Sequence, residues 1–268
     1  MEKKQPQSIR NQRRPKGLIS PFTVNYFHIK NPWVTAWWSA AFPGYGFIIL
    51  GSYVKGFLLV GWELFINISC KLNTAIVYSL TGRFEQAKEV IDLNFFLFYV
   101  AVYIMSIWRT YGLTVDLNKL SILADQEDSS FAPVKLSALE ICYLDKKNPW
   151  MAAALSALAP GLGHLYTHRI PTFFFLLVKF VIVAYFAHLL PAIHYTAVGA
   201  FEHAVALLDP QWLLFFPSLY GFAIYDAYMN TVEYNKLFDM EQSRFIKDNY
   251  QSKNLYQSLE CEFGRCLS

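Results

Sequence analysis

Apolar residues are gathered into blocks along the chain, and charged residues lie almost entirely between the blocks. The blocks cover residues 33–50, 56–68, 95–108, 151–159, 172–190 and 212–228. A helix needs about 20 mostly apolar residues to cross the roughly 30 Å of hydrocarbon in a bilayer. This spacing of apolar blocks therefore predicts an all-α polytopic membrane protein.

The chain matches itself when it is shifted by 117 positions. The run Lys30-Asn31-Pro32-Trp33 recurs as Lys147-Asn148-Pro149-Trp150, and the polar ends of the two stretches stay in the same register. The matched polar residues are Tyr111, Thr114, Asn118 and Lys119 in the first stretch and Tyr228, Thr231, Asn235 and Lys236 in the second. Chance matching of apolar residues would not keep polar positions aligned, so we expect two tandem copies of one unit.

Each copy opens with an apolar block that is broken by a Pro-Gly-x-Gly motif. The motif residues are Pro43, Gly44 and Gly46 in the first copy and Pro160, Gly161 and Gly163 in the second. Proline removes a helical N–H donor and disfavours helix at the preceding residue, while glycine permits the turn. The opening helices should therefore end near Phe42 and Ala159, each as a short half-helix or re-entrant hairpin.

The predicted organisation is a basic tail at 1–29, repeats at 30–120 and 147–237, a linker at 121–146 and a polar C-terminal tail at 238–268. If the broken block does not cross the membrane, each copy has a half-helix and two transmembrane helices, and the repeats are parallel. If it does cross, there are six full spans and the second copy is inverted. The parallel arrangement places most of the Lys and Arg residues between the blocks on one side, so the positive-inside rule favours it.

Composition agrees with lipid as the surrounding medium, because 54% of the residues are hydrophobic, 18% are aromatic and only 16% are charged. The basic tail lacks an apolar core and a cleavage site, so we expect no signal peptide and a cytoplasmic N-terminus. The C-terminus should then also be cytoplasmic. We interpret the tail as a solvated topology anchor that can touch anionic headgroups, and we expect no nucleic-acid partner.

The run Ala153, Ser156, Ala157 and Pro160-Gly161-Leu162-Gly163-His164-Leu165-Tyr166 precedes a short polar turn and a new apolar helix. This pattern resembles the small two-helix membrane hairpin domain that is widespread in bacteria. In the first copy the likeness is weaker, because Phe47 and Ile49 stand where the motif has His and Tyr. The resemblance implies a bacterial cytoplasmic-membrane protein of a family largely without assigned chemistry, and it implies no active site.

Charged residues within the apolar blocks are the first candidates for a functional role, because ionisable groups in a bilayer are usually paired or functional. Glu63 and Lys179 fall on equivalent helices of the two copies, one position apart after the shift of 117. We expect an ion pair between them. Arg109 and Asp226 occupy equivalent positions with opposite charge, which predicts a second link. Structural pairing is favoured over a transport or proton-relay role.

No other pattern of residues predicts a catalytic, metal or cofactor site. His164 and His168 are one helical turn apart, but the favoured topology puts His194 and His203 on the other side of the membrane, so no third ligand is evident. The chain also lacks a nucleotide loop, a nucleophile motif, a zinc-protease signature and a haem ligand pattern.

The leading functional hypothesis is a non-enzymatic membrane scaffold or accessory protein, with the lipid bilayer and a membrane or cytoplasmic protein as partners. The alternative is a small-solute or ion transporter or channel with a site between the two copies, since duplicated units with broken helices often form carriers. A membrane enzyme ranks third. A polar cavity near Glu63 and Lys179 would favour transport, whereas tightly packed aromatic residues there would favour the scaffold.

Overall fold

The computed structural model describes residues 16–20, 22–126, 134–136 and 141–250, and most of these residues are helical. In the first half of the chain the helices are α1 (Pro32–Ala41), α2 (Tyr45–Ile49), α3 (Tyr53–Cys70), α4 (Leu72–Leu80), α5 (Phe84–Val90) and α6 (Leu93–Gln126). In the second half they are α7 (Pro149–Leu158), α8 (Leu162–Tyr166), α9 (Ile170–Phe186), α10 (Leu189–Ala197), α11 (Phe201–Leu207), α12 (Pro210–Leu213) and α13 (Phe215–Tyr250). Short strands form two antiparallel hairpins, β1 (Gly17–Ile19) with β2 (Val24–Tyr26) and β3 (Val134–Leu136) with β4 (Ile141–Tyr143).

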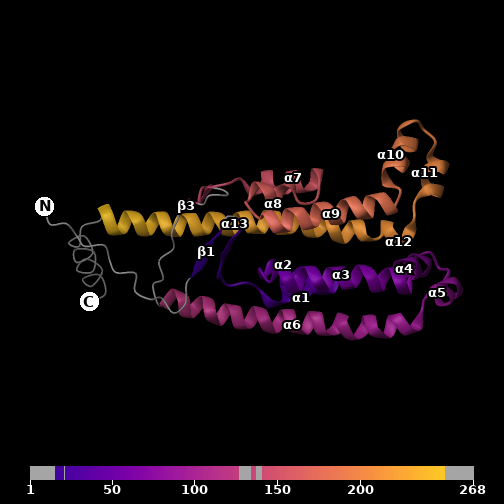
Figure 1. The fold of residues 1–268 in the computed structure, drawn as a ribbon, viewed down its shortest axis with the longest axis horizontal. Helices are drawn as coiled ribbons and strands as arrows, with labels where there is room; N and C mark the ends of the chain where they lie inside the picture. Colours follow the sequence, from indigo (N-terminus) through magenta and orange to yellow (C-terminus); the bar gives the residue numbers. More distant parts are fainter. Residues whose placement is uncertain (1–15, 21, 127–133, 137–140, 251–268) are drawn as a thin grey trace, which may run out of the picture.

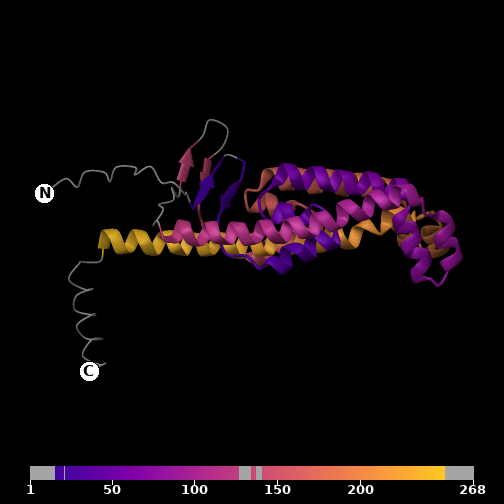
Figure 2. The ribbon, with the colours of Figure 1, turned by 90° about the horizontal axis from the view of Figure 1, so that it is seen from below.

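Helices α3, α6, α9 and α13 run along the long axis of the molecule (Figure 1). The β1–β2 hairpin and the last turns of α6 and α13 lie toward one end, which we call the hairpin end (Figure 2). Helices α4, α5, α10 and α11 lie at the opposite end, which we call the far end. Within each half, the short opening helix packs along the long closing helix, α1 on α6 and α7 on α13.

The opening helices begin and end where the sequence predicts. The side chains of Asn31 and Asn148 accept hydrogen bonds from the backbone N–H of Trp33 and Trp150, and a proline follows each asparagine at the first helical position. The C-terminal caps are Phe42 and Ala159, as expected from the prolines that follow.

The glycines of the Pro-Gly-x-Gly motifs have two separate roles. Gly44 and Gly161 have φ angles of 102° and 108°, a left-handed backbone that side chains disfavour. Gly46 and Gly163 instead allow close approach, because a Cβ atom there would collide with the backbone oxygen of Thr35 or of Ala152 on the opening helix. The motif therefore turns the chain and packs α2 and α8 tightly against α1 and α7.

Two of the described helices are long and apolar enough to cross a bilayer, namely α3 with 18 residues and α6 with 34. Helices α9 and α10 meet the same criterion only as a pair, and they are bent by 63° at the break between them. The described part of the chain thus has two candidate membrane spans, or three if the bent pair forms one. Large apolar side chains such as Leu58, Leu97 and Trp108 point outward and are exposed, which is compatible with a lipid environment.

Aromatic residues from both halves form the core between the long helices. The ring of Tyr45 on α2 stacks on Phe222 of α13 with 4.0 Å between centroids, and Phe57 of α3 stacks on Phe175 of α9 at 4.2 Å. Tyr45 and Phe222 are completely buried. The two halves are therefore joined by buried, closely packed aromatic side chains.

The ends of the long helices and the strands differ from the predicted boundaries. Helix α6 continues to Gln126 and α13 to Tyr250, so both extend into segments expected to be a linker and a tail. The all-α prediction also omitted the β hairpins. Strands of three residues are too short to show an alternating pattern of apolar and polar residues, so the sequence gives little signal for them.

Candidate functional site

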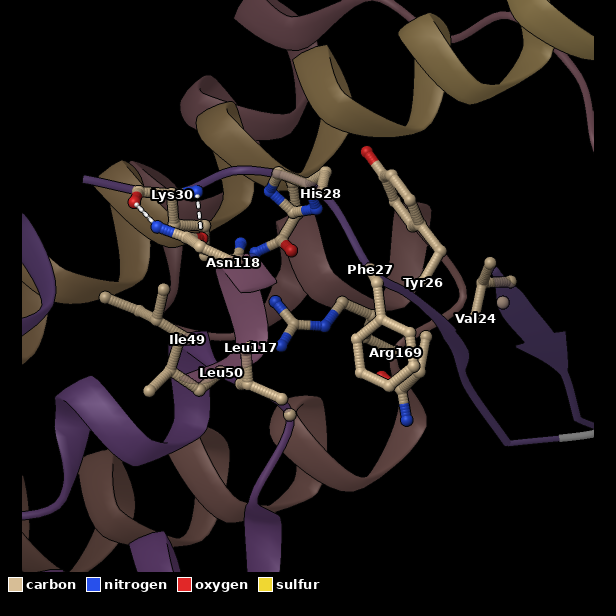
Figure 3. Close-up of a pocket in the computed structure, with 14 residues that line it drawn as sticks. Val24, Tyr26, Phe27, His28, Lys30, Ile49, Leu50, Leu117, Asn118 and Arg169 are labelled. Carbon is tan, nitrogen blue, oxygen red and sulfur yellow. Dashed lines mark hydrogen bonds between the residues drawn. The ribbon is translucent and has the colours of Figure 1, made fainter. Parts of the chain in front are cut away.

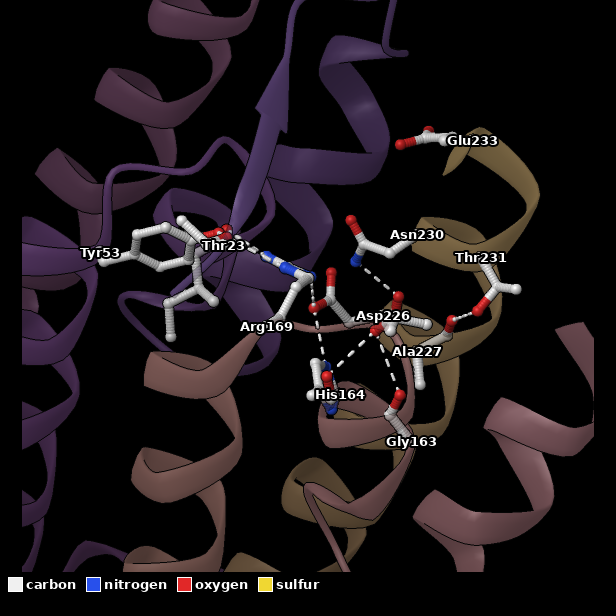
Figure 4. A network of polar contacts seen from close by, with 12 residues as sticks. Thr23, Tyr53, Gly163, His164, Arg169, Asp226, Ala227, Asn230, Thr231 and Glu233 are labelled. Atoms are coloured by element: carbon white, nitrogen blue, oxygen red, sulfur yellow. Dashed lines mark hydrogen bonds and ion pairs between the residues drawn. The ribbon is translucent and has the colours of Figure 1, made fainter. Parts of the chain in front are cut away.

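A buried cluster of charged residues lies between the halves near the hairpin end (Figure 4). Arg169, directly before α9, donates from Nη1 to the carboxylate of Asp226 on α13 at 2.5 Å. Nε2 of His164 on α8 lies 3.0 Å from the same carboxylate oxygen. All three side chains are buried, so Asp226 holds a cation and an imidazole away from water. Such a cluster is costly to assemble and still costlier to break.

Arg169 also joins the two halves of the chain. Its Nη2 donates to the phenolic oxygen of Tyr53 at the start of α3, at 3.2 Å, and to the backbone oxygen of Ile48 at 3.4 Å. Tyr53 in turn donates to the side-chain oxygen of Asn25 in the β1–β2 hairpin, at 3.0 Å. One guanidinium therefore connects α9 and α13 with α2, α3 and the hairpin.

The predicted link between Arg109 and Asp226 does not form, because Arg109 is exposed on the surface of α6. Asp226 has its partners within its own half, at Arg169 and His164. The equivalent sequence positions 109 and 226 occupy opposite environments. A shift of 117 aligns positions along the chain, but it does not determine which face of a helix meets a partner.

Glu63 and Lys179 are both buried between the long helices. Each of them forms hydrogen bonds with residues other than the predicted partner. Lys179 Nζ donates to the phenolic oxygen of Tyr45 at 2.7 Å and lies 3.4 Å from the centre of the Phe42 ring. Glu63 accepts a hydrogen bond from Asn67, one turn further along α3, at 3.2 Å. Lys179 therefore contacts the opposite half of the chain. It does so through its hydrogen bond to Tyr45 and through a cation–π contact with Phe42.

A second polar cluster ties the halves together toward the far end. Gln211 on α12 donates to the side-chain oxygen of Asn67 at 2.8 Å, and its backbone oxygen accepts from Asn73 at 2.8 Å. Its amide oxygen also accepts from the backbone N–H of Thr74 at 3.0 Å. These groups satisfy one another, so the cluster is best explained as structural.

A cavity of about 380 Å³ lies beneath the β1–β2 hairpin, between the two halves (Figure 3). Its lining includes Lys30 and Asn118 from the first half and Arg169 and Asn230 from the second. The backbone N–H of Lys30 donates to the Asn118 side chain at 2.9 Å, and the Asn118 amide donates back to the Lys30 oxygen at 2.8 Å. This reciprocal pair fastens the segment after β2 to α6 and forms one wall.

The same reciprocal pair occurs in the second half, where Lys147 and Asn235 exchange hydrogen bonds of 2.9 and 2.7 Å. Lys147 and Asn235 each lie 117 positions after their counterparts, Lys30 and Asn118. The asparagines of the matched polar tails thus hold the chain ahead of the opening helices. The lysines that follow them, Lys119 and Lys236, are exposed.

Glu233 lies on α13, beyond the apolar block 212–228. It is next to His28 and Lys30, two residues of the cavity lining. Its Oε2 is 2.5 Å from Nε2 of His28 and 3.0 Å from Nζ of Lys30. Burial alone would raise the pKa of this carboxyl, but the contacts with His28 and Lys30 outweigh burial and hold the pKa below its usual range. Glu233 is therefore ionised at neutral pH and anchors the segment after the hairpin to α13.

The residues that form this region were only partly visible in the sequence. Lys30 and Asn118 belong to the matched motifs, and Arg169 is one of the charged residues between two apolar blocks. The contact between His28 and Glu233 could not be predicted from the sequence, because it joins residues more than 200 positions apart. Among the residues that the structure describes, no three or more His, Cys, Asp or Glu side chains gather as metal ligands.

No protein family matches this chain, and no curated protein or solved structure is significantly similar to it. The function must therefore be argued from the geometry of the chain itself.

Proposed function

We propose that this chain is a non-enzymatic multi-pass membrane scaffold or accessory protein built from two tandem parallel repeats. In this proposal α3, α6, α9 and α13 span the membrane, while the pairs α1–α2 and α7–α8 enter it and return. The repeated asparagine contacts, at Asn118 and Asn235, support the duplication. The alternative of six full spans would require the broken opening blocks to cross, whereas α1 and α2 meet the same stretch of α6: Ser39 of α1 hydrogen-bonds to Thr110, and a Cβ atom at Gly46 of α2 would collide with Thr110.

We propose further that the hairpin end faces the cytoplasm of a bacterium and that both termini lie there, in the inner membrane. The described residues Lys16, Lys30, Lys146 and Lys147 contact the ends of α6 and α13 that lie toward this end, which supports the orientation through the positive-inside rule. At 1.5 Å per residue, the 34 residues of α6 extend roughly 51 Å, longer than the bilayer is thick. The last turns of α6 and α13 would then project into the cytoplasm.

Cysteine accessibility tests this orientation. The native cysteines are replaced by serine, and Ser52→Cys and Gln86→Cys are introduced one at a time at the two ends of the molecule. We expect a membrane-impermeant maleimide added to intact cells to label position 86 only, and position 52 to react only after the cells are opened. Labelling of both positions in intact cells, or of neither, would contradict the parallel arrangement. A third useful position, residue 130, lies outside the described residues.

The observation that carries the scaffold proposal is the aromatic packing at the centre of the molecule. The amine of Lys179 lies over the rings of Phe42 and Tyr45, Phe222 stacks on Tyr45, and all three rings have almost no exposed surface. A carrier needs a polar site that opens in turn to each side of the membrane. Here the equivalent space is filled by stacked rings from both halves, as in a structural interface.

Partner capture and flux measurements together test the function. A photo-crosslinking amino acid is placed at the exposed positions Lys119 and Lys236 of the hairpin end and, as a control, at the exposed Leu97 of the apolar part of α6. We expect discrete protein adducts in living cells from positions 119 and 236 and none from position 97. Purified protein in liposomes should not accelerate the passage of protons, sodium or potassium.

Ion flux above that of protein-free liposomes, combined with an absence of adducts at positions 119 and 236, would favour the second candidate, a small-solute or ion transporter or channel. The observation that supports this candidate is the cavity of about 380 Å³ between the halves, with polar residues contributed by both. The cavity is lined by residues of the β1–β2 hairpin, and Lys179 is not among the described residues that line it.

A further inference from the structure

We propose that the cavity beneath the β1–β2 hairpin binds an anionic lipid, with the phosphate group held between Lys30 and Arg169 and the apolar part held against Ile49, Leu50 and Leu117. This inference goes beyond the proposed function and does not depend on it. A scaffold and a transporter are both compatible with a lipid site between the two halves.

The charge of the cavity lining supports an anionic ligand. Among the described residues that line it, Lys30 and Arg169 are cationic and none is acidic. Asp226 and Glu233 are not among these lining residues, and they are paired with Arg169 and Lys30. The cavity itself therefore presents positive groups, which attract a negative charge most strongly where water is partly excluded.

The cations keep N–H donors that can reach a ligand. The guanidinium of Arg169 has five N–H groups, and its hydrogen bonds to Asp226, Tyr53 and Ile48 use at most four of them. The ammonium of Lys30 has three N–H groups, of which one donates to Glu233. Arginine and lysine are the side chains that recognise phosphate best, through charge-assisted hydrogen bonds.

Part of the lining is apolar, and an apolar wall distinguishes a site for a lipid from a site for a free anion. Val24, Phe27, Ile49, Leu50 and Leu117 line the cavity beside the cations (Figure 3). The volume of about 380 Å³ falls within the range of roughly 300–1,000 Å³ that is usual for small-molecule sites. Leu117 follows the apolar block 95–108 of α6 by a few turns, so the cavity lies near the expected headgroup level of the bilayer.

Native mass spectrometry of the full-length protein in detergent tests the proposal. The protein is titrated separately with phosphatidylglycerol and with phosphatidylcholine, and phosphatidylglycerol binding is repeated in the presence of inorganic phosphate. We expect at least about tenfold tighter binding of phosphatidylglycerol, because tenfold corresponds to about 1.4 kcal/mol and one charge-assisted hydrogen bond contributes that much. Millimolar inorganic phosphate should leave the lipid bound.

Three variants assign the binding to this cavity. Lys30→Gln should weaken phosphatidylglycerol binding about tenfold, while Lys147→Gln, at the equivalent position of the second half and outside the cavity lining, should leave it within about twofold. Leu117→Trp fills the cavity without removing a charge and should abolish the selectivity. If Lys30→Gln fails to fold, Leu117→Trp decides the question.

Equal binding of the two lipids would overturn the proposal, as would unchanged selectivity in Leu117→Trp. Displacement of the lipid by inorganic phosphate would show a site for a free anion and would overturn the lipid assignment. A loss of selectivity that is the same in Lys30→Gln and Lys147→Gln would indicate a general charge effect at the membrane surface, and it would also overturn the proposed site.

Discussion

Replacing Asp226 with alanine should destabilise the protein by about 3–5 kcal/mol, because the substitution leaves the buried guanidinium of Arg169 without its counter-ion. The loss is large because Arg169 is buried, so water cannot solvate its unpaired charge in place of the Asp226 carboxylate. His164 loses a hydrogen-bond partner at the same time. The measurement is the free energy of unfolding of the purified protein in mixed micelles of detergent and SDS, compared with the unaltered chain.

The matched control is Arg109→Ala, at the position that corresponds to 226 in the first half. Arg109 is exposed and forms no ion pair with the other described residues, so this substitution should change stability by less than about 0.5 kcal/mol. If both variants are equally stable, the charge cluster of Arg169, Asp226 and His164 does not hold the halves together. If Arg109→Ala is the more damaging variant, the result would support the link between Arg109 and Asp226 that was predicted from the sequence alone.

Replacing Gly163 with alanine should destabilise the protein by about 1–3 kcal/mol through overpacking. A Cβ atom at this position would collide with the backbone oxygen of Ala152 and with Oγ of Ser156, both on α7. It would also approach the Cβ of Ala227 on α13 to 2.8 Å. The Ser156 hydroxyl can rotate, but the Ala152 oxygen and the Ala227 Cβ cannot, so α8 must move away from α7 and α13.

Gly112→Ala supplies the comparison, because Gly112 lies within α6 and a Cβ atom there meets nothing within 4 Å. Alanine is a better helix former than glycine by about 0.5–1 kcal/mol, so this variant should be slightly more stable. The same unfolding assay measures both variants. Opposite signs are expected for the two substitutions, and a stabilising Gly163→Ala would contradict the close packing of α8 against α7.

The local features of this chain follow from short stretches of sequence. Asn31 and Asn148 cap their helices because a proline and a helical run come directly after them, and Phe42 and Ala159 end those helices because the next residue is a proline. Each of these effects acts over a few residues. The pattern of neighbours along the chain is therefore sufficient to predict them.

Contacts between distant residues could be predicted only in part. The sequence identified Glu63, Lys179 and Asp226 as unusual charges, and all three are buried between the halves. It did not identify their partners. Lys179 lies against Phe42 and Tyr45, and Asp226 binds Arg169, a residue that the sequence presented only as a charge beside an apolar block.

The sequence by itself determined an apolar helical protein with candidate membrane spans, the breaks at Pro43 and Pro160, and which polar positions recur after 117 residues. Only the tertiary structure decided which side of each helix is buried, and so placed Arg109 on the surface and Asp226 inside. It also brought Lys30 and Arg169 to one cavity. The physical reason is that burial and pairing depend on how helices rotate and pack against one another, and residues far apart in the chain meet only after that packing is complete.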